Sequence, residues 1–233
     1  MKRLDELVER YGLEPGMEIA LGVLLDLLAR PEAPTSVHDP EEGVDVHLAD
    51  SLIALELEEV EWAGRIADLG AGGGLPGLVL AATLPDTSVE LVESQQRKCA
   101  FLDDAVAAMG LTNADVVCAR AEEWSAGFGT CDVVTARALA ALPVLAEYAA
   151  PLLRDGGVLV AWKGQVDERE AADGAAAAEV LGLALEAVRS VTPYPGSERR
   201  SLHVLRKIAP TPSTYPRRPG MAAKRPLGAA KAG

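Results

Sequence analysis

The spacing of apolar and polar residues changes once along this chain. Near its beginning, apolar side chains recur three or four positions apart, as they do on one face of a helix. This spacing predicts three helices, over residues 4–11, 15–29 and 44–60, and prolines mark a loop before the third. We expect residues 1–62 to form an N-terminal helical extension that packs on the rest of the protein.

From Arg65 onward, short apolar runs alternate with helical patterns, an order typical of a parallel sheet with helices on both faces. The pattern predicts helices over residues 76–84, 95–109, 142–153 and 165–181. The predicted strands are Ile66–Asp68, Val89–Val92, Ala114–Cys118, Asp132–Thr135, Val158–Trp162, Leu185–Val191 and Ser201–Ile208. The last two strands flank a turn and should pair antiparallel. Residues 63–208 are therefore predicted to form an α/β domain with a doubly wound, mostly parallel seven-stranded sheet.

The most informative stretch is RIADLGAGGGLPG, residues 65–77, which places a strand directly before a glycine-rich turn and a helix start. Gly70, Gly72 and Gly74 allow the backbone to bend tightly and to approach a ligand. Pro76 suits the first turn of the following helix, whose N-terminus carries partial positive charge. The turn predicts a binding site for a nucleotide-like cofactor.

Two cofactor classes fit this turn. Gly72, Gly74 and Gly77 satisfy the GxGxxG spacing of dinucleotide-binding folds, which would indicate an NAD-dependent oxidoreductase. Asp68, two residues before the first glycine, instead gives the order DLGAGGG, which resembles motif I of S-adenosylmethionine (SAM) methyltransferases. The aspartate favours SAM, and the oxidoreductase remains the alternative.

In a doubly wound sheet, ligands bind at the carboxyl ends of the strands. Glu93 ends the second predicted strand, where its carboxylate can accept hydrogen bonds from ribose hydroxyls. Ala121 and Glu122 follow the third strand and can meet an adenine edge. Arg137 follows the fourth strand, where its guanidinium group suits a carboxylate or a phosphate.

Charge is distributed unevenly along the chain. The net charge is −13, yet no acidic residue follows Glu198, and nine Lys and Arg residues do. Residues 209–233 form a basic, proline-rich tail that we expect to be extended and poorly structured until it binds a partner. RNA would suit such a tail, although a solvated tail that only keeps the protein soluble is an open alternative.

The three cysteines share no CxxC spacing, so Cys99, Cys118 and Cys131 are predicted to be buried thiols and not disulfides or metal ligands. No metal site is expected. The N-terminus lacks the apolar core of a signal peptide, and no apolar run is long enough to cross a membrane. We expect a cytoplasmic protein.

Taken together, these segments resemble the RsmG (GidB) family of methyltransferases. The stretches that carry the resemblance are TSVHDP, HLADSL, DLGAGGGLPGLVLA, LVESQQRKCAFL, ARAEEW, DVVTARALA, WKGQ, ERRSLHVLRK and YPRRPGMAAKRPLG. The resemblance covers almost the whole chain. It implies a class I SAM methyltransferase with a Rossmann-like fold that methylates N7 of a guanine in 16S ribosomal RNA, leaves S-adenosylhomocysteine as product, and is a monomer.

The resemblance also assigns roles to residues. The implied cofactor contacts are Gly70, Leu75, Ala121, Glu122 and Arg137, with Glu93 as the ribose acid, and Gly72 and Gly74 complete the turn. The predicted RNA contacts are His47, Arg97, Arg120, Arg137, Arg199, Arg217, Arg218, Lys224 and Arg225. Departures from the family pattern at Ala33–Thr35, His38 and Val46 weaken the expectation that the N-terminal helices touch RNA.

The chemistry asked of such an enzyme is modest, because guanine N7 has a free lone pair and needs no general base. We therefore predict no catalytic side chain and expect positioning to dominate. A SAM-dependent enzyme for small molecules and a non-enzymatic RNA-binding module are further alternatives. The sequence leaves open which nucleotide is modified and whether the substrate is naked rRNA or the assembled subunit.

Overall fold

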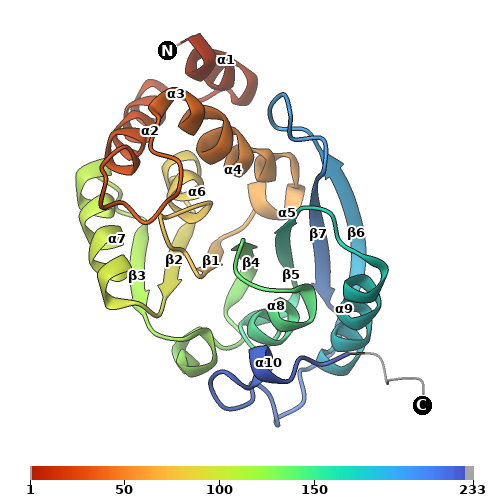
Figure 1. Ribbon diagram of the computed structural model, residues 1–233. Helices are drawn as coiled ribbons and strands as arrows, with labels where there is room; N and C mark the ends of the chain where they lie inside the picture. Colours follow the sequence, from red (N-terminus) through yellow and green to blue (C-terminus); the bar gives the residue numbers. More distant parts are fainter. Residues whose placement is uncertain (1, 229–233) are drawn as a thin grey trace.

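A seven-stranded sheet in the order β3-β2-β1-β4-β5-β7-β6 forms the centre of the molecule (Figure 1). The structure, a computed structural model, describes residues 2–228. The strands are β1 (Arg65–Leu69), β2 (Ser88–Glu93), β3 (Ala114–Cys118), β4 (Cys131–Arg137), β5 (Leu153–Lys163), β6 (Leu183–Val191) and β7 (Arg200–Lys207). Pairing is parallel except along β7, which runs antiparallel to both β5 and β6. The predicted fold class and the antiparallel pair are confirmed.

Helices cover both faces of the sheet. One face carries α1 (Lys2–Tyr11), α2 (Pro15–Leu28), α6 (Gly77–Thr83) and α7 (Gln96–Met109), whose apolar residues share a core with Ile66 and Leu91. The other face carries α8 (Leu142–Ala149) and α9 (Glu168–Leu181), which pack on the opposite side chains of β4 and β5. The helices of residues 1–62 thus bury their apolar stripes in the same core as the sheet.

The predicted helix over residues 44–60 is interrupted. The chain passes from α3 (Pro40–Gly43) through a π-helical turn (Val44–Ala49), α4 (Asp50–Leu52) and a 3₁₀ turn (Ile53–Glu56). Leu57 is then extended before α5 (Glu58–Glu61). π-Helical turns occur often at functional sites, and this one carries His47 and directly precedes Asp50.

The strand β5 begins five residues earlier than predicted, at Leu153, and the preceding helix ends at Ala149. Leu153 is buried, but residues 154–156 that follow it are exposed, so the start of β5 lacks the apolar pattern of a buried strand. A Cβ atom at Gly157 would lie 2.9 Å from the carbonyl oxygen of Cys131, which shows how closely β4 and β5 approach at the irregular pairing between Cys131 and Val133.

The prediction of three buried thiols is wrong for two cysteines. Cys99 of α7 and Cys118, the last residue of β3, form a disulfide with a Cα–Cα distance of 5.8 Å. They are 19 residues apart in sequence, and only the packing of α7 beside β3 brings them together. Cys131 is a buried free cysteine, as predicted.

The prediction of an extended, poorly structured tail is also wrong for the residues that the structure describes. The segment after β7 folds back on the core and includes the short helix α10 (Met221–Lys224), in which Ala222 is buried. Arg217 is held by the buried carboxylate of Glu147 in α8, with its Nε 2.8 Å from Oε1. The paired arginine and the apolar contacts of Ala222, Tyr215 and Leu227 with the core help to anchor the segment. Residues 229–233 of the predicted tail lie outside the described residues.

We expect Arg217→Ala to release this segment from the core. A buried carboxylate that loses its partner costs about 3–5 kcal/mol, and Glu147 regains water if the segment leaves. Tryptic cleavage after Lys224 should therefore become at least about tenfold faster, because about 1.4 kcal/mol corresponds to each factor of ten. Arg218→Ala, a change at the exposed neighbouring residue, is the matched control. Equal cleavage rates in both variants would show that the ion pair does not hold the segment.

Among residues 2–228, no helix has the length and apolar character required to cross a membrane.

Candidate active site

A cavity of about 340 Å³ opens at the carboxyl ends of the first four strands. Its walls come from four segments that are distant in sequence: Leu69–Gly70 after β1, Val92–Gln95 after β2, Ala119–Glu122 after β3, and Ala138–Leu139 after β4. Lys98 and Tyr148 close its sides. β1 and β4 are neighbours, so this is the point where the strand order reverses and where open α/β sheets bind their ligands.

Asp68 shapes the glycine-rich turn from inside the protein. Its Oδ2 accepts a hydrogen bond from the Gly77 N–H at 3.0 Å, and its Oδ1 accepts one from the Thr135 hydroxyl at 2.8 Å. A Cβ atom at Gly77 would lie 2.4 Å from Leu91, so only glycine allows the helix start to approach this closely. Asp68 is fully buried, and its role is to fix the turn that faces the cavity.

The buried Asp68 should make stability depend on pH in a defined window. Burial raises its pKa to about 6, from 3.8, and the bonds from Thr135 and Gly77 only partly offset this. The folded state then binds a proton that the unfolded state has lost, so this stabilisation is present below pH 3.8 and disappears as pH rises through about 6. The shift corresponds to about 3 kcal/mol.

Asp68→Asn keeps one acceptor for the Gly77 N–H and removes the titration. We expect urea unfolding to show the variant gaining stability relative to the wild type as pH rises from about 4 to about 6. Parallel profiles for the two proteins across that window would contradict the assignment.

Glu93 lies in the cavity wall with its carboxylate held by backbone groups. Oε1 accepts hydrogen bonds from the N–H groups of Ser94 at 2.8 Å and Gln95 at 2.9 Å, and Oε2 accepts one from Gly72 at 3.2 Å. These bonds tie the glycine turn to the start of α7. The carboxylate is therefore rigidly placed at the cavity, where the sequence predicted a ribose contact.

Ala121 and Glu122 lie on a 3₁₀ turn at the next wall segment. Glu122 Oε1 accepts a hydrogen bond from the Gly220 N–H at 3.0 Å, so the C-terminal segment reaches the cavity rim. Tyr148 also lines the cavity, and burial raises its pKa. A cofactor held here would lie next to the basic segment.

Sequence reasoning missed two residues of the fourth wall segment. Ala138 has φ +54°, and among the described residues it alone has a positive φ without being glycine. This turn carries Leu139 over the glycine loop, where a Cβ atom at Gly70 would lie 2.6 Å from the leucine Cδ1. Leu139 remains 39% exposed. Strained backbone at an alanine has no sequence signal, so a pattern could not reveal it.

Several predicted cofactor residues lie behind the cavity surface. Gly74 and Leu75 are buried, and Gly74 packs so closely on Leu78 that a Cβ atom there would lie 2.1 Å from it. Gly72 is linked to the cavity by the hydrogen bond from its N–H to Glu93, which lines the cavity. Arg137 does not line the cavity: its Nη1 donates to Asp50 Oδ2 at 2.8 Å and to the Val46 carbonyl at 3.1 Å. Its placement therefore supports no cofactor contact.

The predicted RNA contacts separate into two groups. Arg97, Arg120, Arg199 and three residues of the C-terminal segment, Arg218, Lys224 and Arg225, are exposed. Arg217 is committed to Glu147, and His47 is buried with its Nε2 3.0 Å from the Val37 carbonyl. Burial lowers the pKa of His47, which keeps the ring neutral. The first group is available to a ligand, and the second holds the fold together.

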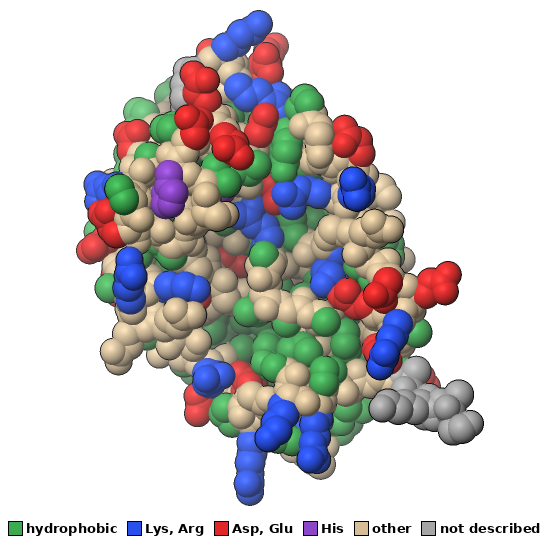
Figure 2. Space-filling view, viewed as in Figure 1, with side chains coloured by type: hydrophobic (Ala, Val, Ile, Leu, Met, Phe, Trp, Pro, Cys, Tyr) green, Lys and Arg blue, Asp and Glu red, His purple; other side chains and the backbone are tan. Residues whose placement is uncertain are grey.

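Basic side chains gather on one face of the molecule. Figure 2 shows Lys and Arg around the hollowed centre of this face and at its lower end, over the segment that contains α10 in Figure 1. Asp and Glu lie mainly along its upper part and sides. The acidic protein thus presents a local surface that suits a polyanion.

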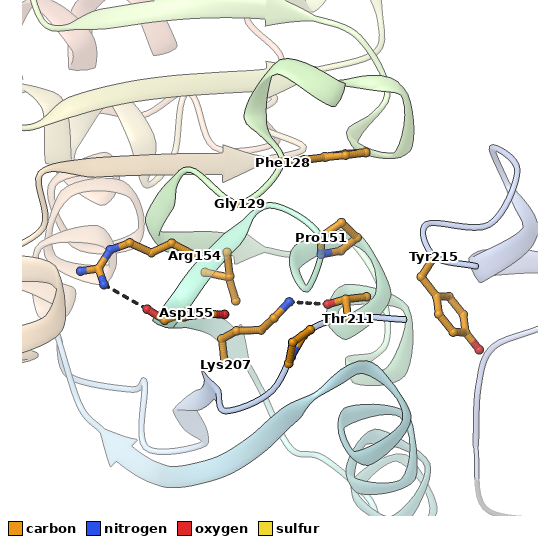
Figure 3. A pocket seen from close by; sticks show the side chains of 10 residues that line it. Phe128, Gly129, Pro151, Arg154, Asp155, Lys207, Thr211 and Tyr215 are labelled. Atoms are coloured by element: carbon orange, nitrogen blue, oxygen red, sulfur yellow. Dashed lines mark hydrogen bonds between the residues drawn. The ribbon is translucent and has the colours of Figure 1, made fainter. Parts of the chain in front are cut away.

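A second pocket lies at the opposite edge of the sheet (Figure 3). It is lined by the first residues of β5, by the last residue of β7 and by the loops beside them, and it includes Arg154, Lys207 and Thr211. The Lys207 ammonium donates to the Thr211 hydroxyl and to the Ala150 carbonyl, and burial lowers its pKa. These bonds fasten the segment after β7. Within residues 2–228, no group of three or more His, Cys, Asp and Glu side chains is arranged to hold a metal ion.

The sheet order, the glycine turn and the cavity define a class I methyltransferase. The family model described as "GidB: rRNA small subunit methyltransferase G" matches residues 30–201. The chain belongs to this family, whose members methylate small-subunit ribosomal RNA.

Individual relatives agree with the family match. Ribosomal RNA small subunit methyltransferase G of Rubrobacter xylanophilus is 47% identical over 195 residues, which cover 81% of this chain and 75% of that protein. The Moorella thermoacetica protein of the same name is 39% identical over 240 residues, covering 97% and 100%.

Solved structures share the fold at low sequence identity. "StiE O-MT residues 961-1257" is similar with a TM-score of 0.56 and 11% identity, covering 68% of this chain and 73% of that one. M. jannaschii TYW2 in complex with AdoMet gives a TM-score of 0.50 and 15% identity, covering 67% and 74%. These likenesses show the fold alone.

Proposed function

We propose that this protein transfers a methyl group from SAM, held in the cavity, to N7 of a guanine in 16S ribosomal RNA. The observation that carries the proposal is the cavity at the strand-order reversal, which joins a glycine turn, the fixed carboxylate of Glu93 and the wall segment that contains Ala121 and Glu122. Family membership shows the reaction class and that the substrate is small-subunit rRNA. The methylated base, guanine, and the methylated atom, N7, are part of the proposal.

The residues of the cavity fit this cofactor. Gly70 offers backbone without a side chain, and the carboxylate of Glu93 suits the ribose hydroxyls. Ala121 and Glu122 suit the adenine, and Leu139 covers the turn from the other side. When bound, SAM supplies an electrophilic sulfonium methyl group. Glu93 and the glycine turn are held in place before a ligand binds, so the site loses little conformational entropy on binding.

We assign no general base, because guanine N7 carries a free lone pair. The contribution of the protein is to hold the two reactants in place, which can supply on the order of 7 to 11 kcal/mol. The guanine must be accessible in a loop or flipped from its stack. Arg120 at the cavity wall and the bases of the C-terminal segment are placed to hold neighbouring phosphates.

The test is transfer of labelled methyl from SAM to isolated small subunits and to naked 16S rRNA, followed by mapping of the modified base. We expect the label on N7 of one guanine in 16S rRNA, and the better substrate shows whether ribosomal proteins are required. Label on another atom or base would refute N7-guanine specificity. We further propose a monomer in the cytoplasm, which light scattering and cell fractionation would check.

A further inference from the structure

Two arginines from distant parts of the chain meet on one buried carboxylate. Arg137 ends β4 and Arg200 begins β7, while Asp50 follows the π-helical turn. Asp50 Oδ2 accepts a hydrogen bond from Arg137 Nη1 at 2.8 Å, and Arg200 Nε lies 3.2 Å from Oδ1. The Asp50 side chain is only 1% exposed. Its backbone carbonyl accepts a hydrogen bond from the Trp162 ring N–H at 2.7 Å.

The charges of this cluster do not balance. Among the described residues, Asp50 is the one carboxylate in ion-pair contact with these guanidinium groups; the buried Asp68 acts on Arg137 electrostatically without such contact, and Arg200 keeps the excess positive charge. His47 adds none, because burial lowers its pKa. The pair with Arg200 is also incomplete: its Nε is not aligned to hydrogen-bond Asp50 Oδ1, which is buried without a donor. A half-buried excess charge requires an anion or water, so pairing with Asp50 alone does not account for both arginines.

Both arginines keep donors for a ligand. Arg137 uses Nη1 for Asp50 and Val46, and no acceptor in residues 2–228 engages its Nε or Nη2. Arg200 directs Nε and Nη2 to the Tyr194 hydroxyl, at 3.2 and 2.7 Å, which leaves Nη1. Their side chains are 16% and 35% exposed, so a ligand can reach them.

The cluster lies beside the mouth of the cavity. Arg137 directly precedes Ala138 and Leu139 of the cavity wall. Ser201, next to Arg200, pairs with Lys163 at the carboxyl end of β5. The cluster therefore borders the cavity on the side away from Glu93, and this is the side from which a substrate would approach.

We propose that Arg137 and Arg200 form a subsite for a backbone phosphate of the substrate RNA, and that Asp50 is the positioning residue, which hydrogen-bonds Arg137 and lies at ion-pair distance from Arg200. The inference rests on the proposed function and adds Arg200 and Asp50 to it. Guanidinium groups match phosphate through paired N–H donors: Arg137 keeps such a pair in Nε and Nη2, and Arg200 adds a single donor, Nη1. Tyr194 orients Arg200 from the other side.

Arg200→Ala tests the subsite. We expect the KM for the RNA that the wild type methylates to rise about tenfold, and the slope of log affinity against log salt to fall by roughly 0.7 to 0.9, the contribution of one phosphate. The Kd for SAM should not change. Arg200→Lys should restore the salt slope with partial recovery of KM, because lysine contacts phosphate as a point charge. Arg154→Ala, an exposed arginine at the other edge of the sheet, is the control.

Asp50→Asn tests positioning separately. Both arginines keep their charges, so the salt slope should remain, while kcat falls because the phosphate is no longer held in one place. A wild-type kcat in Asp50→Asn would overturn the positioning role. A wild-type KM and salt slope in Arg200→Ala would overturn the subsite.

Fluorescence anisotropy with labelled small-subunit rRNA separates this inference from the proposed function. If the wild type binds the RNA without methylating it, the proposed function fails, whereas the comparison of Arg200→Ala with the wild type still decides the subsite.

Discussion

Gly72→Asp is expected to lower the affinity for SAM at least about a hundredfold without unfolding the protein. Gly72 has φ +55°, and its N–H donates to Glu93 Oε2. An aspartate there adds strain and places a second carboxylate beside Glu93. At about 5 Å and an effective dielectric constant of about 20, the repulsion is about 3 kcal/mol, enough to turn Glu93 away from its backbone partners. Isothermal calorimetry with SAM measures the loss.

Gly12→Asp is the matched control for this change. Gly12 has φ +60° and open space around its Cβ position, so it carries the same backbone strain and the same charge away from the cavity. Its SAM affinity should equal that of the wild type. Equal affinities in Gly72→Asp and Gly12→Asp would show that the turn does not bind the cofactor.

Neutralising the exposed bases of the C-terminal segment is the second change with a large expected effect. The triple variant Arg218→Gln, Lys224→Gln and Arg225→Gln keeps Arg217 on Glu147, so the segment stays anchored. Three lost phosphate contacts should lower the salt slope by roughly 2 to 3 and RNA affinity by at least about tenfold at moderate salt. RNA binding measured across a salt series tests this, and SAM affinity should not change.

The control for the triple variant removes three exposed bases elsewhere: Lys2→Gln, Arg10→Gln and Arg154→Gln. The net charge is then the same, so an effect of total charge alone would appear in both proteins. An equal loss of RNA affinity in the two variants would mean that the C-terminal segment has no special part in binding.

Hydrophobic pattern was sufficient to predict the sheet. Strands such as β1 and β2 are buried on both faces, so their sequences are short apolar runs, and β2 ends in a polar residue, Glu93, at the cavity. Glu93 was predicted at the cavity for this reason, and it lies there. β5 shows the limit: its exposed residues 154–156 carry no apolar signal, and the pairing of Leu153 with Cys131 of β4 extends the strand back to Leu153.

Partners chosen by tertiary packing could not be predicted. Arg137 was expected over the cofactor, but Asp50, 87 residues away in sequence, draws it to the neighbouring subsite. The Cys99–Cys118 disulfide depends on how α7 packs beside β3. Arg217 looked like one more base in a charged tail, and the buried Glu147 that engages it gives no signal in the sequence.

Binding of SAM in the cavity at the carboxyl ends of the strands is tested by a calorimetric titration of the purified wild-type protein with SAM and, separately, with NAD. We expect saturable one-to-one binding of SAM and no binding of NAD. A folded protein that does not bind SAM, or that binds NAD instead, would contradict this expectation.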